Sequence, residues 1–277
     1  MDRFNKYQKA MLDAALDYAA RGWAVIPVSR SKVPINANGS RGATKDSEQI
    51  RAWWSEYPNA QIGIATGAIS GIWVVDIDMK NGKNGISALE QRFGDQYVLQ
   101  ENTLAQKTPT GGYHLVYAWD SEREVHNAQD IVEGVDIRGD GGFIVAAPSS
   151  FKVGTEWIAY QWNENNNAPT QAPDWAWELT EKAEAKRSQP VDFNKALGGI
   201  DQGGRDNDLF RIACMLRSRE VSQPTAITFI EILAERCNPP FDVVEARSKV
   251  ERAYTVYEND EAESAIERIK RRRAAQK

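Results

Sequence analysis

Two carboxylates close an apolar stretch of the sequence, Gly71-Ile-Trp-Val-Val-Asp-Ile-Asp78. Alternate side chains of a β-strand point to the same face, so Asp76 and Asp78 are predicted to face together, with their Cα atoms roughly 7 Å apart. Carboxylates at that spacing can converge on two divalent cations about 3.5–4 Å apart. Asp-x-Asp also occurs in solvated loops, but unpaired charge at the end of an apolar strand is costly, which favours a metal site here.

A third acid lies in a second stretch, Val135-Asp-Ile-Arg138, which leads into Gly139 to Ser149. In a strand, Asp136 and Arg138 would share one face. Arg138 could donate to phosphate or pair with one of the carboxylates. Asp140 precedes two glycines and fits an ordinary hairpin turn rather than a ligand position.

A third stretch contains a histidine, His114, just after a pair of glycines. It reads Ala105-Gln-Lys-Thr-Pro-Thr-Gly-Gly-Tyr-His-Leu-Val-Tyr117. The pattern predicts a strand, a turn and a returning strand in which His114 and Val116 share a face. A lone histidine on a strand is more often structural. The glycines would allow a ligand to approach the backbone closely, which gives His114 a possible role in binding.

Helices and further strands must position these residues. We expect a helix over residues 4–21 that stops at Gly22, a strand over 23–28, and a polar loop with Lys32 and Arg41 that is either a solvated turn or a lid over an anionic substrate. Asp46 and Gln49 resemble a capping box. A strand over 61–66 and the turn at 67–71 predict a hairpin with the acidic strand.

Composition limits the class of protein. The 277 residues, 42% of them hydrophobic, can form one large core and a second smaller one. We expect a cytoplasmic protein, since neither a membrane-spanning run nor a signal peptide is evident, and Cys214 and Cys237 lie in helical patterns that suit reduced thiols. A net charge of −5 argues against an avid, sequence-independent duplex binder.

Taken together, the ordered motifs resemble the bifunctional primase/polymerase domain of the archaeo-eukaryotic primase superfamily. They are Val-Val-Asp-Ile-Asp78, Thr-Pro-Thr-Gly-Gly-Tyr-His114 and Val-Asp-Ile-Arg138, preceded by Gly22-Trp-Ala-Val-Ile-Pro27. The resemblance implies an α+β fold, with an RRM-like catalytic sheet, an N-terminal α/β unit and a small C-terminal helical bundle. It also implies that Asp76, Asp78 and Asp136 hold two catalytic ions, Mg²⁺ or Mn²⁺, and that His114 contacts the incoming nucleotide.

Nucleotidyl transfer also requires groups that hold the triphosphate. Arg138, Lys32 and Arg41 are the candidate cations by position, and Arg138 is the best of them because it shares a face with Asp136. Thr110 and Gly111 could add hydroxyl or backbone donors to phosphate oxygens.

The expected domains are a catalytic domain over residues 1–170, a linker over 171–200 that is partly helical over 176–186, and a helical domain over 201–277. Asp206 or Asn207 is the expected N-cap of the first helix after the linker. The sequence Gly204-Arg-Asp-Asn207 resembles a turn in the helical domain that often follows such catalytic domains. The resemblance implies that this domain helps bind template and initiating nucleotide. The basic residues at 268–273 form either a solvated end or an arm for nucleic acid.

The sequence therefore predicts a template-dependent nucleotidyltransferase that makes and extends primers on single-stranded DNA from NTPs or dNTPs, with a possible helicase in cis or in trans and no membrane partner. One alternative is a non-catalytic replication protein that binds single strands or an origin. A sugar-nucleotide glycosyltransferase with an Asp-x-Asp motif is disfavoured, because it leaves the His114 and Asp136 stretches unexplained.

Overall fold

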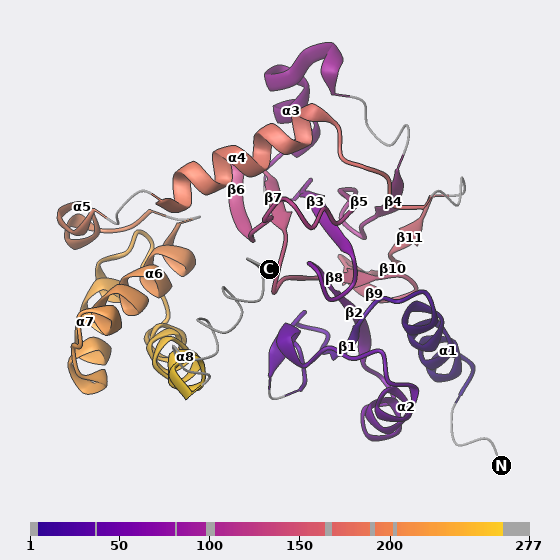
Figure 1. Ribbon diagram of the computed structural model, residues 1–277, viewed down its shortest axis with the longest axis horizontal. Coiled ribbons are helices and arrows are strands. Elements are labelled where there is room, and N and C mark those ends of the chain that lie inside the picture. Colours follow the sequence, from indigo (N-terminus) through magenta and orange to yellow (C-terminus); the bar gives the residue numbers. More distant parts are fainter. Residues whose placement is uncertain are drawn as a thin grey trace, which may run out of the picture. The chain divides into compact units, whose positions relative to one another are not determined.

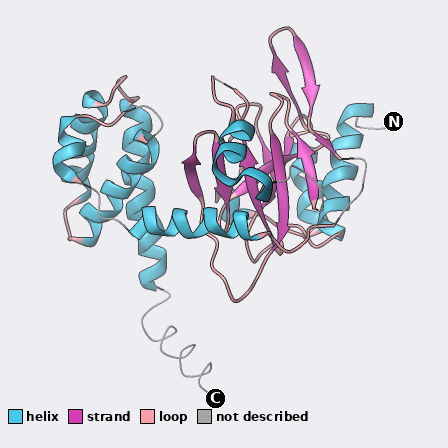
Figure 2. Cartoon of the chain, turned by 90° about the horizontal axis from the view of Figure 1, so that it is seen from above, coloured by secondary structure: helices cyan, strands magenta, loops and turns pink. Residues whose placement is uncertain are grey.

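A computed structural model describes residues 5–36, 38–80, 82–97, 103–163, 168–188, 192–201 and 204–262 (Figure 1). The chain divides into two units, Met1–Ser188 and Gln189–Lys277. Within the described ranges, all strands belong to the first unit and the second unit is built from helices (Figure 2). None of the described helices is long and apolar enough to cross a membrane. The basic run at 268–273 lies outside the described residues.

The first unit is organised around a six-stranded antiparallel sheet with the strand order β11-β4-β5-β3-β7-β6. In that order the strands are Gln161–Trp162, Leu104–Lys107, Tyr113–Ala118, Ile72–Ile77, Val135–Arg138 and Ala128–Val132. The acidic strand β3 is therefore central. Its two neighbours are the strands that carry His114 and Asp136, which lie far from β3 along the chain.

The two faces of β3 pack into different cores, as its alternation predicts. Trp73, Val75 and Ile77 belong to a core with helices α3 (Gly85–Phe93) and α4 (Asp174–Ser188). Ile72 and Val74 belong to a second core on the opposite face. Figure 1 shows α3 and α4 on one side of the sheet and α1 and α2 on the other. Asp76 shares a face of the strand with Ile72 and Val74, because alternate residues point the same way. It therefore lies on the face of the sheet opposite α4.

A smaller sheet packs in the second core. Its order is β1-β2-β8, formed by Val25–Val28, Gln61–Ala65 and Phe143–Ala146, and α1 (Lys6–Ala20) and α2 (Ser47–Glu56) pack against it. The first helix ends as predicted, since Gly22 has a φ of +88°. The predicted hairpin of residues 61–66 with the acidic strand is wrong, because β2 pairs with β1 and β8.

Two local predictions also change. The segment after Arg138 is not a hairpin turn, because β7 and β8 belong to different sheets. Asp46 caps α2 by accepting from the Glu48 N–H, which is a simple cap in place of the expected box. The remaining elements of the unit are η1 (Gly39–Gly42), η2 (Gly94–Gln96), β9 (Ser150–Val153) and β10 (Glu156–Ala159), the last two forming a ribbon.

The predicted linker, residues 171–200, contains the helix expected over 176–186 as part of α4, but this helix packs against the large sheet. Within α4, Trp175, Leu179 and Ala183 recur every four residues and are buried against the large sheet. The Trp175 ring lies 5.2 Å from that of Tyr97 and 5.8 Å from that of Phe93, measured between centroids. Helix α4 is thus part of the core of the first unit.

Helices α5 (Phe193–Gly198), α6 (Arg205–Ser218), α7 (Gln223–Arg236) and α8 (Val243–Ala262) form the second unit around its own core. The backbone of Gly204 occupies the N-cap of α6, so the expectation that Asp206 or Asn207 caps this helix is wrong. The mixed α/β architecture with antiparallel sheets and C-terminal helices agrees with the α+β class. The RRM-like description stays a prediction.

Candidate active site

The centre of the site is a row of polar side chains across neighbouring strands. In the register of the sheet, Asp76 of β3 lies opposite His114 of β5 and also opposite Asp136 of β7. Directly paired residues share a face of the sheet, so these three side chains point to the same side. The His114 Nε2 atom is 3.4 Å from Oδ1 of Asp76. The strand pairing thus assembles a histidine and two carboxylates from three separated segments.

Arg138 bridges the two carboxylates. Its Nε and Nη2 atoms donate to Oδ2 of Asp76 at 3.2 and 3.0 Å, and Nη2 also donates to Oδ2 of Asp136 at 2.7 Å. The side chain of Arg138 retains 27% of its exposure, against 13% for Asp76 and 15% for Asp136. Of the two roles considered for Arg138 from sequence, the structure therefore displays the ion pair.

These contacts change the proton affinities of the site. Burial acts to raise the pKa of Asp76, but attraction from His114 and Arg138 outweighs it and holds that pKa below its ordinary value. Burial raises the pKa of Asp136, and the negative charge of Asp76 adds to this increase. Burial alone would lower the pKa of Arg138, yet the two carboxylates raise it. The guanidinium is therefore the countercharge of both acids.

Asp78 lies one residue beyond the end of β3, where its backbone is held on both sides. Its N–H donates to the Gly134 carbonyl at 2.7 Å, and its carbonyl accepts from the Gly85 N–H at 3.0 Å. A Cβ on Gly85 would come within 2.5 Å of the Gly134 oxygen, so only glycine fits there. Oδ1 of Asp78 pairs with the Lys80 ammonium at 2.9 Å, and its charge also acts on Asp136 and Arg138.

Lys32 reaches the same region from the loop after β1. Its ammonium lies 5.0 Å from the ring centre of Phe151 and 5.8 Å from that of Tyr160. Partial burial lowers the pKa of Lys32, as does repulsion from Lys80, while Asp76 and Asp78 oppose the decrease. Lys32 is therefore a cation that Asp76 and Asp78 attract. The ion pairs that these two acids form with other described residues do not include it.

Thr110 and Gly111 form the turn between β4 and β5. Gly111 has a φ of +88°, and its N–H donates to the Thr108 carbonyl at 3.0 Å. A Cβ on the next residue, Gly112, would lie only 2.0 Å from the carbonyl oxygen of Ile77. The glycine therefore lets the turn pack against the last residue of β3, between Asp76 and Asp78 in the chain. Arg41 lies on η1, which is tied to the Gly141 carbonyl through Ser40.

Carboxylates are suitable ligands for Mg²⁺ or Mn²⁺. In the described part of the chain, however, no group of three or more His, Cys, Asp or Glu side chains is arranged to hold a metal ion. The physical reason is that Arg138 lies between Asp76 and Asp136, while Lys80 pairs with Asp78. The donor set fits a divalent cation in its chemistry, and binding would require these two cations to release carboxylate oxygens.

Sequence reasoning missed several residues that support the row. Gln106 is fully buried, and its Nε2 lies 2.7 Å from Nδ1 of His114. The Tyr160 ring lies 5.6 Å from the His114 ring, measured between centroids. The N–H of Asp130 donates to Oδ1 of Asp136 at 2.9 Å. The sequence placed Gln106 in the predicted strand before the glycine turn, but its partners lie on other strands, which the sequence does not show.

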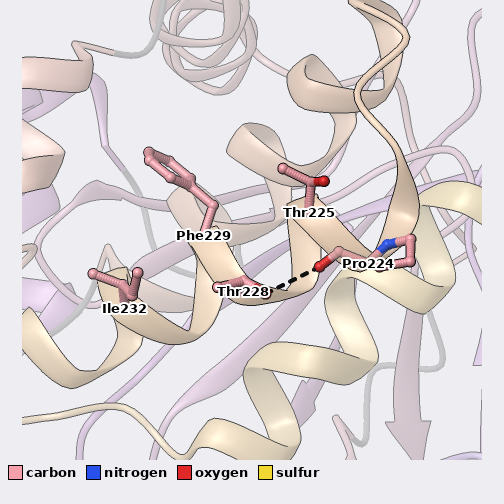
Figure 3. A pocket seen from close by; sticks show the side chains of 5 residues that line it. All are labelled: Pro224, Thr225, Thr228, Phe229 and Ile232. Atoms are coloured by element: carbon pink, nitrogen blue, oxygen red, sulfur yellow. Dashed lines mark hydrogen bonds between the residues drawn. The ribbon is translucent and has the colours of Figure 1, made fainter.

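In the helical unit, the Gly204-Arg-Asp-Asn207 segment is the N-cap and the start of α6, and it makes internal contacts. Arg205 donates to the carbonyls of Pro239 and Pro240, and Asp206 pairs with Lys249. A shallow hollow on α7 is lined by Pro224, Thr225, Thr228, Phe229 and Ile232 (Figure 3). It has no charged side chain, so its lining does not suit a triphosphate.

Comparison with protein families gives two matches. Residues 15–175, more than half of the chain, match the bifunctional DNA primase/polymerase N-terminal family, and residues 194–255 match the primase C-terminal 1 family. A search of curated proteins found no similar protein. The two matches lie in the same order as the domains suspected from the sequence, and they support a primase or polymerase function in DNA replication. The chain belongs to the bifunctional DNA primase/polymerase family.

Proposed function

We propose that the first unit is a template-dependent nucleotidyltransferase that synthesises primers and extends them on single-stranded DNA. The observation that carries this proposal is the register of β3, which places Asp76 opposite both His114 and Asp136. An acid between a second acid and a histidine, on the face of a sheet, suits a site that handles both metal ions and an anionic substrate.

In this proposal, Asp76, Asp78 and Asp136 hold two divalent ions, Mg²⁺ or Mn²⁺. When bound, such ions activate the primer 3′-hydroxyl and neutralise charge on the leaving pyrophosphate. The chain's own part is to keep the three carboxylates together before the ions arrive. Arg138 does this for Asp76 and Asp136 in the structure, and the backbone bonds of Asp78 fix the third acid.

The incoming NTP or dNTP would meet several donors. If Arg138 released the two carboxylates, its guanidinium would be available for phosphate oxygens, for which its planar fork is well suited. Lys32 lies in the loop after β1, and His114 offers a ring nitrogen beside Asp76. Thr110 adds a hydroxyl on the same turn, whereas the Gly111 N–H would have to release the Thr108 carbonyl before it could donate to phosphate. Together these groups would orient the triphosphate.

The single-stranded template and the initiating nucleotide are the proposed partners of the helical unit, in line with its primase C-terminal match. Arg205 would have to give up the carbonyls of Pro239 and Pro240 to contact DNA, so we assign it a structural role. A helicase in cis or in trans is a further proposed partner.

One observation favours a second candidate, a non-catalytic replication protein that binds single strands or an origin. The candidate ligands are paired with cations, Asp76 and Asp136 with Arg138 and Asp78 with Lys80. The two candidates differ in one property. Both bind DNA, but only the enzyme incorporates nucleotides.

The deciding experiment offers unprimed and primed single-stranded DNA with NTPs, dNTPs or both, in Mg²⁺ or Mn²⁺. We expect metal-dependent products that Asp76→Asn, Asp78→Asn and Asp136→Asn each abolish. Glu178→Gln is the matched control, because Glu178 is a half-exposed acid paired with Arg92 on the surface. Unchanged extension by the three variants would refute the site, whereas DNA binding without any incorporation would favour the non-catalytic candidate.

A further inference from the structure

Gln106 joins the candidate site to the smaller sheet. It is paired with His114 in the register of β4 and β5, and both residues are buried, with exposed fractions of 0% and 4%. Its side-chain amide makes three short contacts. Nε2 lies 2.8 Å from the Val145 carbonyl oxygen and 2.7 Å from Nδ1 of His114, and Oε1 lies 2.8 Å from the Ala147 nitrogen.

The backbone partners fix which way the amide points. The Ala147 N–H is a donor and requires an oxygen opposite it, while the Val145 carbonyl is an acceptor and requires the NH₂ group. Rotating the amide by 180° would place like groups against each other at both contacts. In a fully buried position that arrangement would leave a donor and an acceptor unsatisfied, which is costly.

The fixed amide determines the state of the histidine ring. One hydrogen of the NH₂ group goes to Val145, so the other points at Nδ1 of His114. Nδ1 must then be bare in order to accept it. In the neutral ring the hydrogen therefore sits on Nε2, the nitrogen that faces Asp76 at 3.4 Å.

We propose that Gln106 is a positioning residue: by keeping Nδ1 of His114 bare, it directs an N–H from Nε2 toward the side of the sheet where Asp76 and the incoming nucleotide meet. His114 then acts on the nucleotide as a hydrogen-bond donor. The part of this inference that concerns the nucleotide rests on the proposed function, whereas the part that concerns the imidazole does not.

The imidazole is tested by NMR of the full chain labelled with ¹⁵N-histidine. The chain has only two histidines, so the variant His126→Asn assigns both rings. At about pH 8.5, where an ordinary imidazole is neutral, we expect Nδ1 of His114 to show the shift of a bare nitrogen that accepts a hydrogen bond. In Gln106→Met the bond is lost and the shift moves to that of a free bare nitrogen. In Gln106→Glu an acceptor faces Nδ1, so we expect a proton there.

The nucleotide is tested by steady-state extension of a primed single strand. In Gln106→Met we expect KM for the incoming nucleotide to rise about tenfold, equivalent to about 1.4 kcal/mol, with a smaller change in kcat. Thr103→Val is the matched control. Thr103 is also buried, and its hydroxyl links the Val116 carbonyl to the Thr170 N–H without touching His114. This control should lose stability but keep KM and the His114 resonances.

A proton on Nδ1 of His114 in the unmodified chain would overturn the proposal, and this measurement does not depend on any variant folding. Identical His114 spectra in the unmodified chain and Gln106→Met would overturn it as well. A chain that shows the expected ring spectra but incorporates no nucleotide would refute the proposed function and leave the role of Gln106 in fixing the ring intact. An equal rise of KM in Thr103→Val would reduce Gln106 to a purely structural residue.

Discussion

Replacing Arg138 with methionine should destabilise the metal-free protein and increase its response to divalent metal. Arg138 is the cation between Asp76 and Asp136, to which it donates hydrogen bonds at 2.7 to 3.2 Å. Methionine keeps much of the side-chain volume but removes the charge. Two carboxylates on neighbouring strands then face each other without their main countercharge.

The cost follows from the burial of the group. Removing one partner of a buried ion pair typically costs about 3–5 kcal/mol. We expect the lower end, since Asp76 retains His114, Asp136 retains the Asp130 N–H, and the three side chains keep 13% to 27% of their exposure. A loss of about 3 kcal/mol corresponds to a decrease of roughly 6–12 °C in the melting temperature of a unit of this size.

Tryptophan fluorescence is the natural assay, because all nine tryptophans lie between Trp23 and Trp177, within the first unit. Urea unfolding would be followed with EDTA and again with Mn²⁺, for the unmodified chain and for Arg138→Met. The metal replaces the missing countercharge, so it should stabilise the variant more than the unmodified chain. Arg92→Met is the matched control. It breaks the exposed pair with Glu178 and a contact with the neighbouring Phe93 ring, and it should cost at most about 1 kcal/mol.

Two results would refute this reasoning. If Arg138→Met unfolds at the same urea concentration as the unmodified chain in EDTA, the carboxylates do not depend on the guanidinium. If Mn²⁺ stabilises both chains equally, Arg138 and the metal do not compete for the same oxygens, and the proposal that ions displace Arg138 fails.

Three further outcomes are expected. Lys32→Met should raise KM for the incoming nucleotide roughly five- to tenfold with little change in kcat, as for one charged contact worth about 1 kcal/mol, measured by primer extension. Trp175→Ala should lower the free energy of unfolding by about 3–5 kcal/mol, because Trp175 is 4% exposed, whereas Trp157→Ala, at 53% exposure, should change it little. Burial raises the pKa of Tyr18 to about 12, above its ordinary value of 10.0, so the neutral phenol stabilises the fold below pH 10 and that stabilisation disappears as pH rises toward 12. In urea unfolding between about pH 9 and pH 12, Tyr18→Phe should therefore lose less stability than the unmodified chain, by an amount on the order of 2–3 kcal/mol.

Each of these outcomes can fail in a specific way. A fall in kcat alone for Lys32→Met would place the lysine in the chemical step and not in nucleotide binding. Equal effects of the two tryptophan variants would mean that α4 contributes little to the core. An unchanged alkaline slope in Tyr18→Phe would mean that the phenol, which donates to the Ala147 carbonyl and accepts from Trp162, titrates normally in the folded chain.

The sequence predicted which face each strand residue occupies, because that depends only on the period of two. Asp76 was placed with Ile72 and Val74 on this basis, and the two cores of the structure agree. Strand partners were harder to predict. Gly67 to Gly71 looked like a hairpin turn, yet Ile62 pairs with Ala146, more than eighty residues away. Local turn chemistry cannot report such a long-range partner.

The packing of α4 was missed for a different reason. The Glu and Lys residues of α4 give the segment a polar composition, and that composition led to the prediction of a partly helical linker. The informative signal was the spacing of Trp175, Leu179 and Ala183, which places three apolar side chains on one helical stripe against the sheet. The spacing of apolar residues is therefore a better predictor of a buried helix than the mean composition of the segment, because a helix needs only one apolar face to pack into a core.

For the candidate site, the sequence could likewise predict the face of a strand residue but not the neighbouring strands that supply its partners. The face shared by Asp136 and Arg138 follows from their spacing, but the bond from Arg138 to Asp76 requires β3 to lie beside β7, which spacing does not determine. Gln106 likewise acquires its role only because β8 brings the Val145 carbonyl to it. Both side chains are polar groups whose partners come from other strands, and a buried polar group must find such partners. The face that Arg138 shares with Asp136 therefore identified the arginine as a candidate from the sequence, whereas Gln106 could be identified only once the partners of its strand were known.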